Sequence, residues 1–471
     1  MRRRAAWLLL LVLPACNEHL AHPAPPMDRF FFPSGLALTP VAGGNQALLV
    51  VSANFDLRYD KQEGATLLSV DPSDTAVGGS LGRADGVLAK LGPGAQLGSY
   101  AGTVGVADEV TCPGALGGPQ AFVASRYTHR LYRFPLQDGA VAPCSLAKLC
   151  QFDLEPDLYD PAPVGLACRA DGARRSLWVS YLRSPWIGGF QPGTGWLSEF
   201  NIDNLNAEPR TIALAPGPVG DMAYDGQFDR LYAVGRFAGL SAPLYILDLP
   251  ACSHDHEDPT GKKDCPTARV QTVDLYSALR GAELVGIALS NPQPGRPRMA
   301  YVSARVFDET YAASTASRPP FDIGGALLVL ELEEGVSGEP SARVRQVVPI
   351  GLGAGLVRVL PKRAGLGDLV VVPSAGDGSL YLFDDETHEV VRIISVDQGT
   401  GAPEAGHAPY GLVVEDRGAE ALVYVAAFAD WTVSVLRVPL ASPDEADLLR
   451  YPPEPGSTGP GKPMRIGRAR Q

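Results

Sequence analysis

Short apolar runs, bounded by glycine, proline and polar turns, recur along almost the whole chain. The clearest case spans residues 407–438, where the apolar segments 412–414, 422–427 and 432–436 are rich in β-branched or aromatic residues. Runs of this length between turn residues predict three short strands in a meander. A single meander cannot bury both of its faces, so the pattern predicts further copies that pack against it.

Six more copies precede this one, and each has a glycine near the start of its first predicted strand. These marker glycines are Gly35, Gly102, Gly165, Gly220, Gly286, Gly355 and Gly411. Innermost strands of a radial array converge on an axis, where a Cβ atom would crowd the neighbouring strand. We therefore predict an all-β fold, a seven-bladed β-propeller of antiparallel four-stranded blades over residues 29–438. The alternative is an ordinary sandwich in which the glycines mark β-bulges.

The seventh copy also carries a family resemblance. Residues 424–436 read Tyr-Val-Ala-Ala-Phe-Ala-Asp-Trp-Thr-Val-Ser-Val-Leu, and a Pro-x-Gly precedes them at 409–411. This stretch resembles the YVTN-type repeat of bacterial seven-bladed, lactonase-like β-propellers. The resemblance implies the propeller fold. The resemblance does not indicate a particular function, because such propellers include surface and periplasmic proteins, lactonase-like proteins and cofactor-bearing proteins.

The seventh predicted blade needs a fourth, outer strand. Either residues 29–32, ahead of the first blade, or the C-terminal tail, residues 439–471, supplies it. Within the tail the candidates are Met464, Arg465 and Ile466. A ring closed by both termini leaves no exposed sheet edge.

The composition agrees with a fold of many short strands and limits the classes of binding partner. Charged residues make up 20% of the 471, while 52 glycines and 42 prolines supply frequent turns. The formal net charge is −12. An acidic chain lacks the basic footprint of a nucleic-acid-binding protein, so we expect no nucleic-acid partner.

The N-terminus has the features of a bacterial lipoprotein signal. Arg2, Arg3 and Arg4 precede a short apolar run, and Leu-Pro-Ala leads into Cys16. This resembles a lipobox and implies a signal peptide over residues 1–15, a lipidated Cys16 and a tether over residues 16–28. We expect a protein anchored by its lipid in the bacterial envelope, at the outer membrane and facing the periplasm or the exterior. The alternative is an ordinary secretory signal with an incidental cysteine.

Six cysteines remain after Cys16, an even number that favours disulfides in an oxidising compartment. Cys252 and Cys265 bracket one hydrophilic loop with no strand between them, so we predict that they pair. Several pairings remain open for Cys112, Cys144, Cys150 and Cys168.

Arginine recurs where the second predicted strand of a repeat ends. Arg126, Arg183, Arg236 and Arg305 hold this position, or lie beside it, in four consecutive repeats, and Asn54 holds it in the first. The links into the first strand, including Tyr410, are expected on the same face. Guanidinium groups match carboxylates and phosphates, so we predict a binding face for an anionic small molecule or glycan. The alternative is that each arginine pairs with a nearby carboxylate, for which the candidates are Asp308, Glu309, Asp229 and Glu199.

Two other functions remain open. A lactonase-like hydrolase would use Glu283 and His407 at the channel mouth, and a scaffold would hold another envelope protein through its aromatic loops. One glutamate and one histidine are too few ligands for a metal-dependent propeller lactonase, so we expect no metal. No Cys-x-x-Cys-His or Gly-x-Ser-x-Gly occurs in the sequence, and we expect no cofactor.

Overall fold

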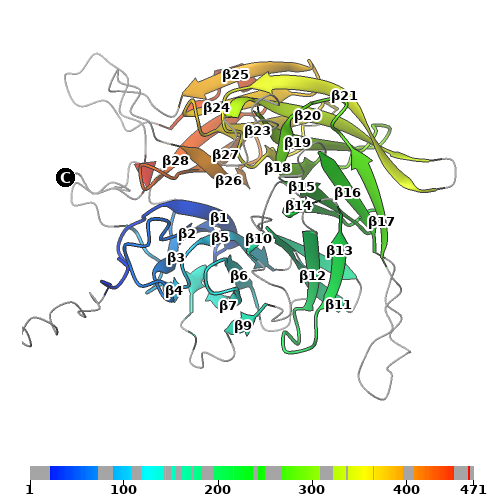
Figure 1. The fold of residues 1–471 in the computed structure, drawn as a ribbon. Helices are drawn as coiled ribbons and strands as arrows, with labels where there is room; N and C mark the ends of the chain where they lie inside the picture. Colours follow the sequence, from blue (N-terminus) through cyan, green and yellow to red (C-terminus); the bar gives the residue numbers. More distant parts are fainter. Residues whose placement is uncertain are drawn as a thin grey trace, which may run out of the picture.

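The computed structural model shows an all-β, seven-bladed propeller of antiparallel blades (Figure 1). It describes residues 22–72, 88–108, 112, 118–142, 144, 150–154, 162–171, 174–182, 195–215, 217–236, 242–249, 268–307, 322–335, 338–363, 365–395, 408–449 and 465–466. The fold class predicted from the seven repeats is confirmed.

Strands follow one another from the axis outward in every blade. Blades 1 to 3 contain β1 (Pro33–Pro40), β2 (Gln46–Ser52), β3 (Ala65–Val70) and β4 (Ala95–Leu97); β5 (Ala101–Ala107), β6 (Gln120–Ser125), β7 (Arg130–Gln137), β8 (Ala140–Val141) and β9 (Gln151–Asp153); and β10 (Pro163–Asp171), β11 (Arg174–Tyr181), β12 (Gly195–Asn201) and β13 (Arg210–Leu214).

The same order continues in the second half of the chain. Blades 4 and 5 contain β14 (Val219–Asp225), β15 (Arg230–Gly235), β16 (Pro243–Asp248) and β17 (Arg269–Asp274); and β18 (Ala282–Leu289), β19 (Met299–Phe307), β20 (Asp322–Glu334) and β21 (Pro340–Ile350). Blades 6 and 7 contain β22 (Arg358–Val359), β23 (Leu369–Ser374), β24 (Ser379–Asp384) and β25 (Glu389–Ser395); and β26 (Pro409–Asp416), β27 (Glu420–Ala427), β28 (Thr432–Pro439), a 3-10 turn (Pro443–Glu445), β29 (Asp447–Leu448) and β30 (Arg465–Ile466).

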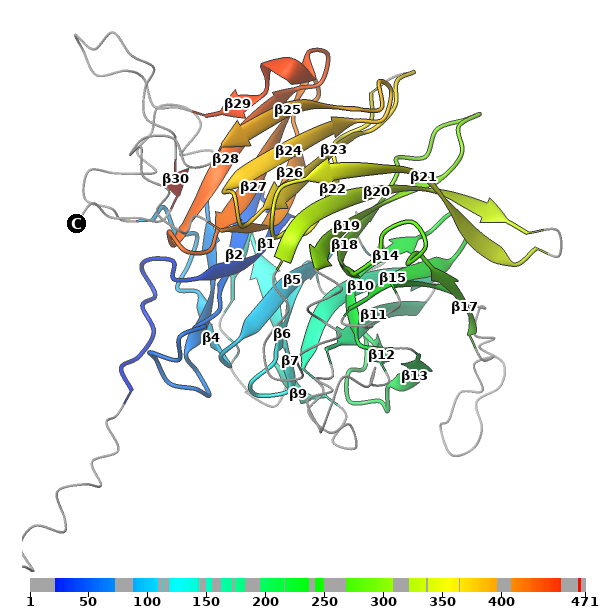
Figure 2. The same cartoon turned by 45° about the horizontal axis from the view of Figure 1, so that its top comes forward.

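The ring closes between the first and last blades. Innermost strand β1 contacts both β5 and β26, and Figure 2 shows β1 and β26 side by side. In blade 7 both outer strands, β29 and β30, pair with β28, and Ile466 lies opposite Val433. Residues 29–32 form no strand, but Phe30 joins the core between blades 7 and 1. The C-terminal tail thus supplies the outer strands of the last blade.

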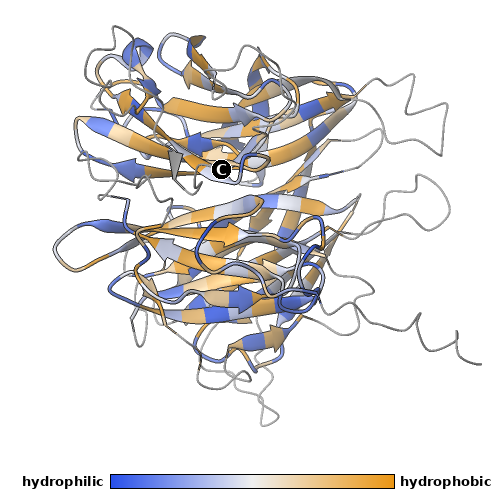
Figure 3. Cartoon of the chain, turned by 90° about the vertical axis from the view of Figure 1, so that its left-hand side faces the viewer, coloured by the Kyte–Doolittle hydropathy of each residue, from blue (hydrophilic) through white to orange (hydrophobic). Residues whose placement is uncertain are grey.

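Both faces of the blades are buried, which explains the continuous apolar runs. Along β2, Leu48 and Val50 point into the core shared with blade 7, while Leu49 and Val51 point into the core shared with blade 2. Hydrophobic residues fill the strands and polar residues concentrate at their ends (Figure 3). Successive side chains of a strand point to opposite faces, so an uninterrupted apolar run matches a sheet packed between two neighbours.

The marker glycines lie where inner strands meet. A Cβ atom on Gly35 would come within 2.5 Å of the Gly102 carbonyl oxygen, and one on Gly411 within 2.5 Å of the Ser34 carbonyl oxygen. Gly165, Gly286 and Gly355 face the next inner strand in the same way. Gly102 differs, because its nearest neighbour would lie at 3.8 Å. Five of the seven positions therefore need glycine for the close approach of two backbones.

Substitution of Gly411 tests this crowding. Gly411→Ala forces the backbone of β26 away from Ser34 at the ring closure, and overpacking of this kind costs about 1–3 kcal/mol. We expect a lower midpoint of urea unfolding. Gly324→Ala is the control, because no atom lies within 4 Å of a Cβ built there. Equal midpoints for the two variants would contradict the crowding argument.

Candidate functional site

Each inner strand is entered through a residue with a left-handed backbone. These residues are Phe32, Tyr100, Ala162, Gly217, Gly281, Gly353 and Ala408, with φ between 36° and 89°. In most blades the carbonyl of this residue accepts a hydrogen bond from the end of the second strand, as Tyr100 does from the Arg126 amide at 3.4 Å. The chain thereby brings both links to one face around the axis, which we call the channel mouth.

A small cavity, lined by both charged and apolar residues, lies on the axis behind the channel mouth. Its lining includes Arg126, Asp221, Arg236 and Tyr410, from blades 2, 4 and 7. The space is about 40 Å³. A void of this size admits a few water molecules. A metabolite would therefore have to bind at the channel mouth, with only a small chemical group inside the cavity.

Arg236 is held by a carboxylate from the next blade. Its Nε donates to Glu283 Oε1 at 2.5 Å, and its Nη2 lies against the same oxygen. Burial by itself lowers the pKa of Arg236, but the charge of Glu283 and then the phenol of Tyr410 outweigh it, and the pKa is raised. The buried pair joins blade 4 to blade 5 and keeps Arg236 charged.

Arg126 has no counter-charge among the described residues. Its side chain takes part in no ion pair within the described part of the chain, and its Nε is buried with no hydrogen-bond partner there. Burial is the largest cause of its lowered pKa; the phenols of Tyr410 and Tyr100 act in the opposite direction, while Arg236 adds to the decrease. An anion at the mouth would supply the missing partner of this guanidinium group.

A third arginine, which the sequence analysis missed, approaches the same cavity. Arg358 Nη1 lies 3.6 Å from Asp221 Oδ2, and Asp221 also accepts a hydrogen bond from the Ile287 amide at 3.2 Å. Burial raises the pKa of Asp221, although Arg358 opposes the increase. Three guanidinium groups thus face two carboxylates around the axis. Arg358 is the first residue of β22, whereas the predicted arginines lie at or beside the end of a second strand.

The other predicted ligand residues differ in their placement. Arg305 lies opposite Glu283 in the β18–β19 ladder, and its Nε donates to the Ala354 carbonyl at 3.4 Å. Asn54 is fully buried and holds its own loop, because its amide donates to Ser99 Oγ at 2.7 Å and accepts from the Tyr59 amide at 3.1 Å. The side chain of Asn54 thus serves the local structure. Arg183 lies outside the described residues.

The carboxylate partners suggested for the arginines were wrong where the structure describes them. Asp229 and Glu199 bind Arg169, at 2.6 Å and 3.4 Å, and not a channel-mouth arginine. Arg169 extends from the far end of an inner strand, where the first and second strands of a blade join. Arg236 instead uses Glu283, which we had assigned to the hydrolase alternative. Asp308 and Glu309 lie outside the described residues.

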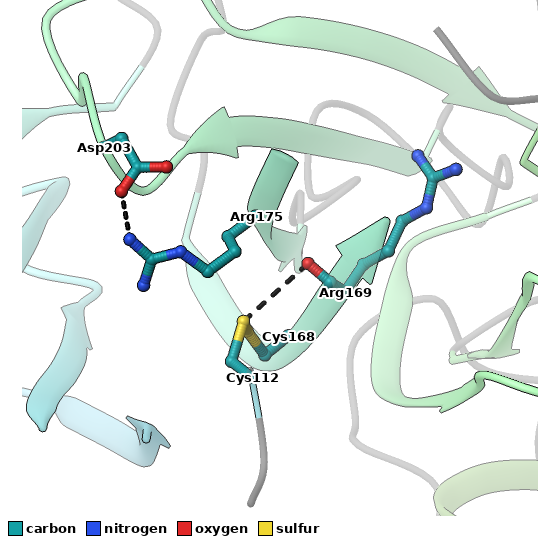
Figure 4. The surroundings of a disulfide bond; sticks show 5 residues. All are labelled: Cys112, Cys168, Arg169, Arg175 and Asp203. Carbon is teal, nitrogen blue, oxygen red and sulfur yellow. Dashed lines mark hydrogen bonds and ion pairs between the residues drawn. A yellow bond between two sulfur atoms is a disulfide. The ribbon is translucent and has the colours of Figure 1, made fainter. Parts of the chain in front are cut away.

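Two disulfides fix the pairing that the sequence left open. Cys112 bonds Cys168 and joins blade 2 to blade 3 beside Arg169 (Figure 4). Cys144 bonds Cys150 within blade 2. Cys252 and Cys265, predicted to pair, lie outside the described residues, as do the lipidation candidate Cys16 and the hydrolase candidate His407.

Within the described residues, no group of three or more histidines, cysteines or carboxylates is arranged to hold a metal ion. The same part of the chain contains no helix with the length and apolar character of a membrane span. Fold and site together define a seven-bladed β-propeller with an arginine-bearing axial mouth, an architecture consistent with a binding or interaction module.

Comparisons with known proteins extend only to the fold. No family model matches the chain, and no curated protein matches it. Among solved structures, dihydro-heme d1 dehydrogenase NirN in complex with DHE aligns with a TM-score of 0.44 and 11% identity, covering 92% of this chain and 67% of that one. BBS1N in complex with ARL6DN aligns with a TM-score of 0.43 and 11% identity, covering 90% and 96%. Neither likeness carries an argument about function.

The ion pair between Arg236 and Glu283 has a testable structural consequence. Arg236→Met leaves Glu283 as an unpaired buried carboxylate, which costs about 3–5 kcal/mol of unfolding free energy. We expect a large decrease in the urea midpoint. The double variant Arg236→Met/Glu283→Leu removes both charges and should recover most of the loss. A double variant as unstable as the single one would show that the pair is not the cause.

Proposed function

We propose that the protein is a binding module whose channel mouth takes an anionic ligand. The single observation that carries the proposal is the Nε of Arg126, which is buried and has no hydrogen-bond partner among the described residues, at a mouth that Arg126 shares with Arg236 and Tyr410. A charged donor removed from water without a partner is unfavourable, and a carboxylate or phosphate relieves that cost.

The arrangement of charges supports one acidic group per ligand at this position. Glu283 already neutralises the charge of Arg236, so Arg236 does not supply a second free charge to the ligand. It can still donate hydrogen bonds from its guanidinium group. Tyr410 lines the same cavity. The cavity itself is too small for a whole metabolite, so the rest of the ligand lies outward, over the mouth.

The hydrolase alternative finds less support. Glu283 is buried and its Oε1 is bound to Arg236, so this carboxylate oxygen is already engaged within the protein. The proposed module therefore binds its ligand without transforming it.

Arg126 tests the proposal directly. Galacturonate, citrate and inorganic phosphate would be compared with neutral galactose by thermal shift and calorimetry, because a ligand of the folded state raises its melting temperature. We expect at least one of the anions to bind. We expect Arg126→Gln to weaken that binding about tenfold to a hundredfold, the equivalent of about 1.5–3 kcal/mol for a charge-assisted hydrogen bond.

Arg343→Gln serves as the matched control. Arg343 lies exposed on outer strand β21, where Glu331 and Glu333 bind it. This variant should bind the anion like the unmodified protein. Equal binding of galactose, no response to any of the three anions, or full affinity in Arg126→Gln would each overturn the proposal.

We also propose that Cys16 anchors the module to a bacterial membrane, with the outer membrane as its location. The basic start of the chain, the short apolar run and the small residue before Cys16 support the proposal. Acyl chains on Cys16 would hold the protein at the surface, and the tether over residues 16–28 would separate the propeller from it.

Membrane fractionation of cells tests the anchor. Cys16→Ser should move the protein from the membrane fraction to the soluble fraction after export. Cys144→Ser changes a cysteine of the propeller and should leave the fractionation unchanged. Membrane association that persists in Cys16→Ser would contradict lipidation at this residue.

A further inference from the structure

Six aromatic side chains from three blades form a connected row beside Arg126. The rings follow one another with centroid distances of 5.5, 5.1, 5.4, 5.5 and 6.3 Å. In spatial order they are Trp431, Phe32, Phe428, Phe55, Tyr100 and Tyr127, and we call this row the aromatic arc. It spans blades 7, 1 and 2.

The aromatic arc is continuous with the channel mouth. Tyr127 directly follows Arg126 in the chain, and the Arg126 amide donates to the Tyr100 carbonyl at 3.4 Å. The phenol of Tyr100 also acts on the pKa of Arg126. At the other end, the guanidinium group of Arg58 lies 5.5 Å from the centre of the Trp431 ring. Each end of the aromatic arc therefore has an arginine.

Propeller architecture does not require aromatic residues at these positions. Phe32 and Tyr100 enter their inner strands in the left-handed region, with φ of 45° and 54°, whereas the other five blades use glycine or alanine at this point. Trp431, with φ of 61°, ends a four-residue turn that blade 6 closes with Gly378. A bulky residue is unfavourable in this conformation, and such strain is concentrated at functional sites.

The aromatic arc presents apolar surface to solvent. Phe55 is 52% exposed at its centre, and the remaining five rings are half-buried. Phe55 packs edge-on against Tyr100 and Phe428, with interplanar angles of 85° and 82°. This edge-to-face packing fixes the rings and leaves no parallel pair between which a flat ring could insert.

We infer that the aromatic arc binds an acidic oligosaccharide, with one uronic-acid carboxylate on Arg126 and the following sugar rings laid over the aromatic side chains. The inference rests on the proposed function, because Arg126 receives the acidic group. The apolar C–H faces of pyranose rings match exposed aromatic surface, and the phenols and Arg58, which is paired with Asp56, can bind sugar hydroxyls. A row of rings suits a chain of sugars better than a single metabolite. The aromatic arc lies beside a single buried guanidinium nitrogen without a partner, that of Arg126, and the protein has a formal net charge of −12, which favours a glycan over a nucleic-acid strand.

Calorimetry with galacturonate, tetragalacturonate and neutral maltotetraose tests the inference. The tetramer should bind at least tenfold more tightly than the monomer, and maltotetraose should bind weakly or not at all. Phe55→Ala and Trp431→Ala should each weaken tetragalacturonate binding about tenfold and leave monomer binding unchanged. Phe55→Ala is the more decisive variant, because Phe55 is exposed and its loss leaves no buried cavity.

Phe228→Ala is the matched control. Phe228 is 41% exposed and stacks on Arg230 away from the channel mouth, in the turn that joins β14 to β15. This variant should retain full affinity for the tetramer. A pentamer of thymidylate is the nucleic-acid comparison, and tighter binding of it than of tetragalacturonate would overturn the inference.

The experiment separates this inference from the proposed function. If the monomer binds through Arg126 while Phe55→Ala and Trp431→Ala keep full tetramer affinity, the anion site stands and the glycan inference is overturned. If the tetramer depends on the aromatic arc but Arg126→Gln has no effect, the anion site is overturned, and with it the acidic character of the ligand.

Discussion

Packing of one blade against the next is the constraint on which the structure depends. Each adjacent pair of blades shares one apolar cluster, and seven such clusters close the ring, including the one between blades 7 and 1. A four-stranded sheet with two apolar faces has no stable state alone, so every blade depends on both neighbours. Burial of a large aliphatic side chain contributes about 1.5–3 kcal/mol, and the strands supply many of them.

The same packing determines where chemistry can occur. Because the inner strands converge, glycines such as Gly35 and Gly411 hold backbones in contact and little space remains on the axis. Polar groups in that space need partners, and Arg236 finds one in Glu283 of the next blade. Functional side chains are thereby restricted to the links at the channel mouth, where side chains face solvent and each blade can differ from the others.

The fold was predictable from the sequence because the same strand pattern occurs in seven repeats. Continuous apolar runs, turn residues and marker glycines recur in every repeat, and errors in one repeat are corrected by the others. Some residues of the channel mouth were predictable by comparing equivalent positions of the repeats. Arg126, Arg236 and Tyr410, which this comparison selects, line one cavity in the structure. Their partners were not predictable, since the pair of Arg236 with Glu283 joins residues of different blades that are 47 positions apart.

The aromatic arc was not predictable from the repeat pattern. Residues 407–438 follow the repeat most regularly, and the second strand of this repeat ends without an arginine. Yet Phe428 and Trp431 belong to its short turn, and Phe32 and Tyr100 occupy the entrances to two other inner strands. The signal lay in the side chains at positions where the backbone favours glycine. A small residue with a left-handed backbone costs the fold little. A phenylalanine or tryptophan at such a position is unfavourable, so the local backbone conformation and the choice of residue disagree there.

That conflict connects the scaffold to the site. Blades 7, 1 and 2 place large rings on a strained backbone next to Arg126, whose buried Nε has no hydrogen-bond partner in the described part of the chain. Either feature alone has an ordinary structural explanation, since aromatic clusters close seams and arginines stiffen loops. Their adjacency is less easily explained by stability, because both are unfavourable in the free protein and both would be relieved by one ligand that offers a carboxylate and apolar ring faces. The ring of blades supplies enough packing energy to tolerate both features, and it holds them rigidly enough for a ligand to bind without reorganising the site.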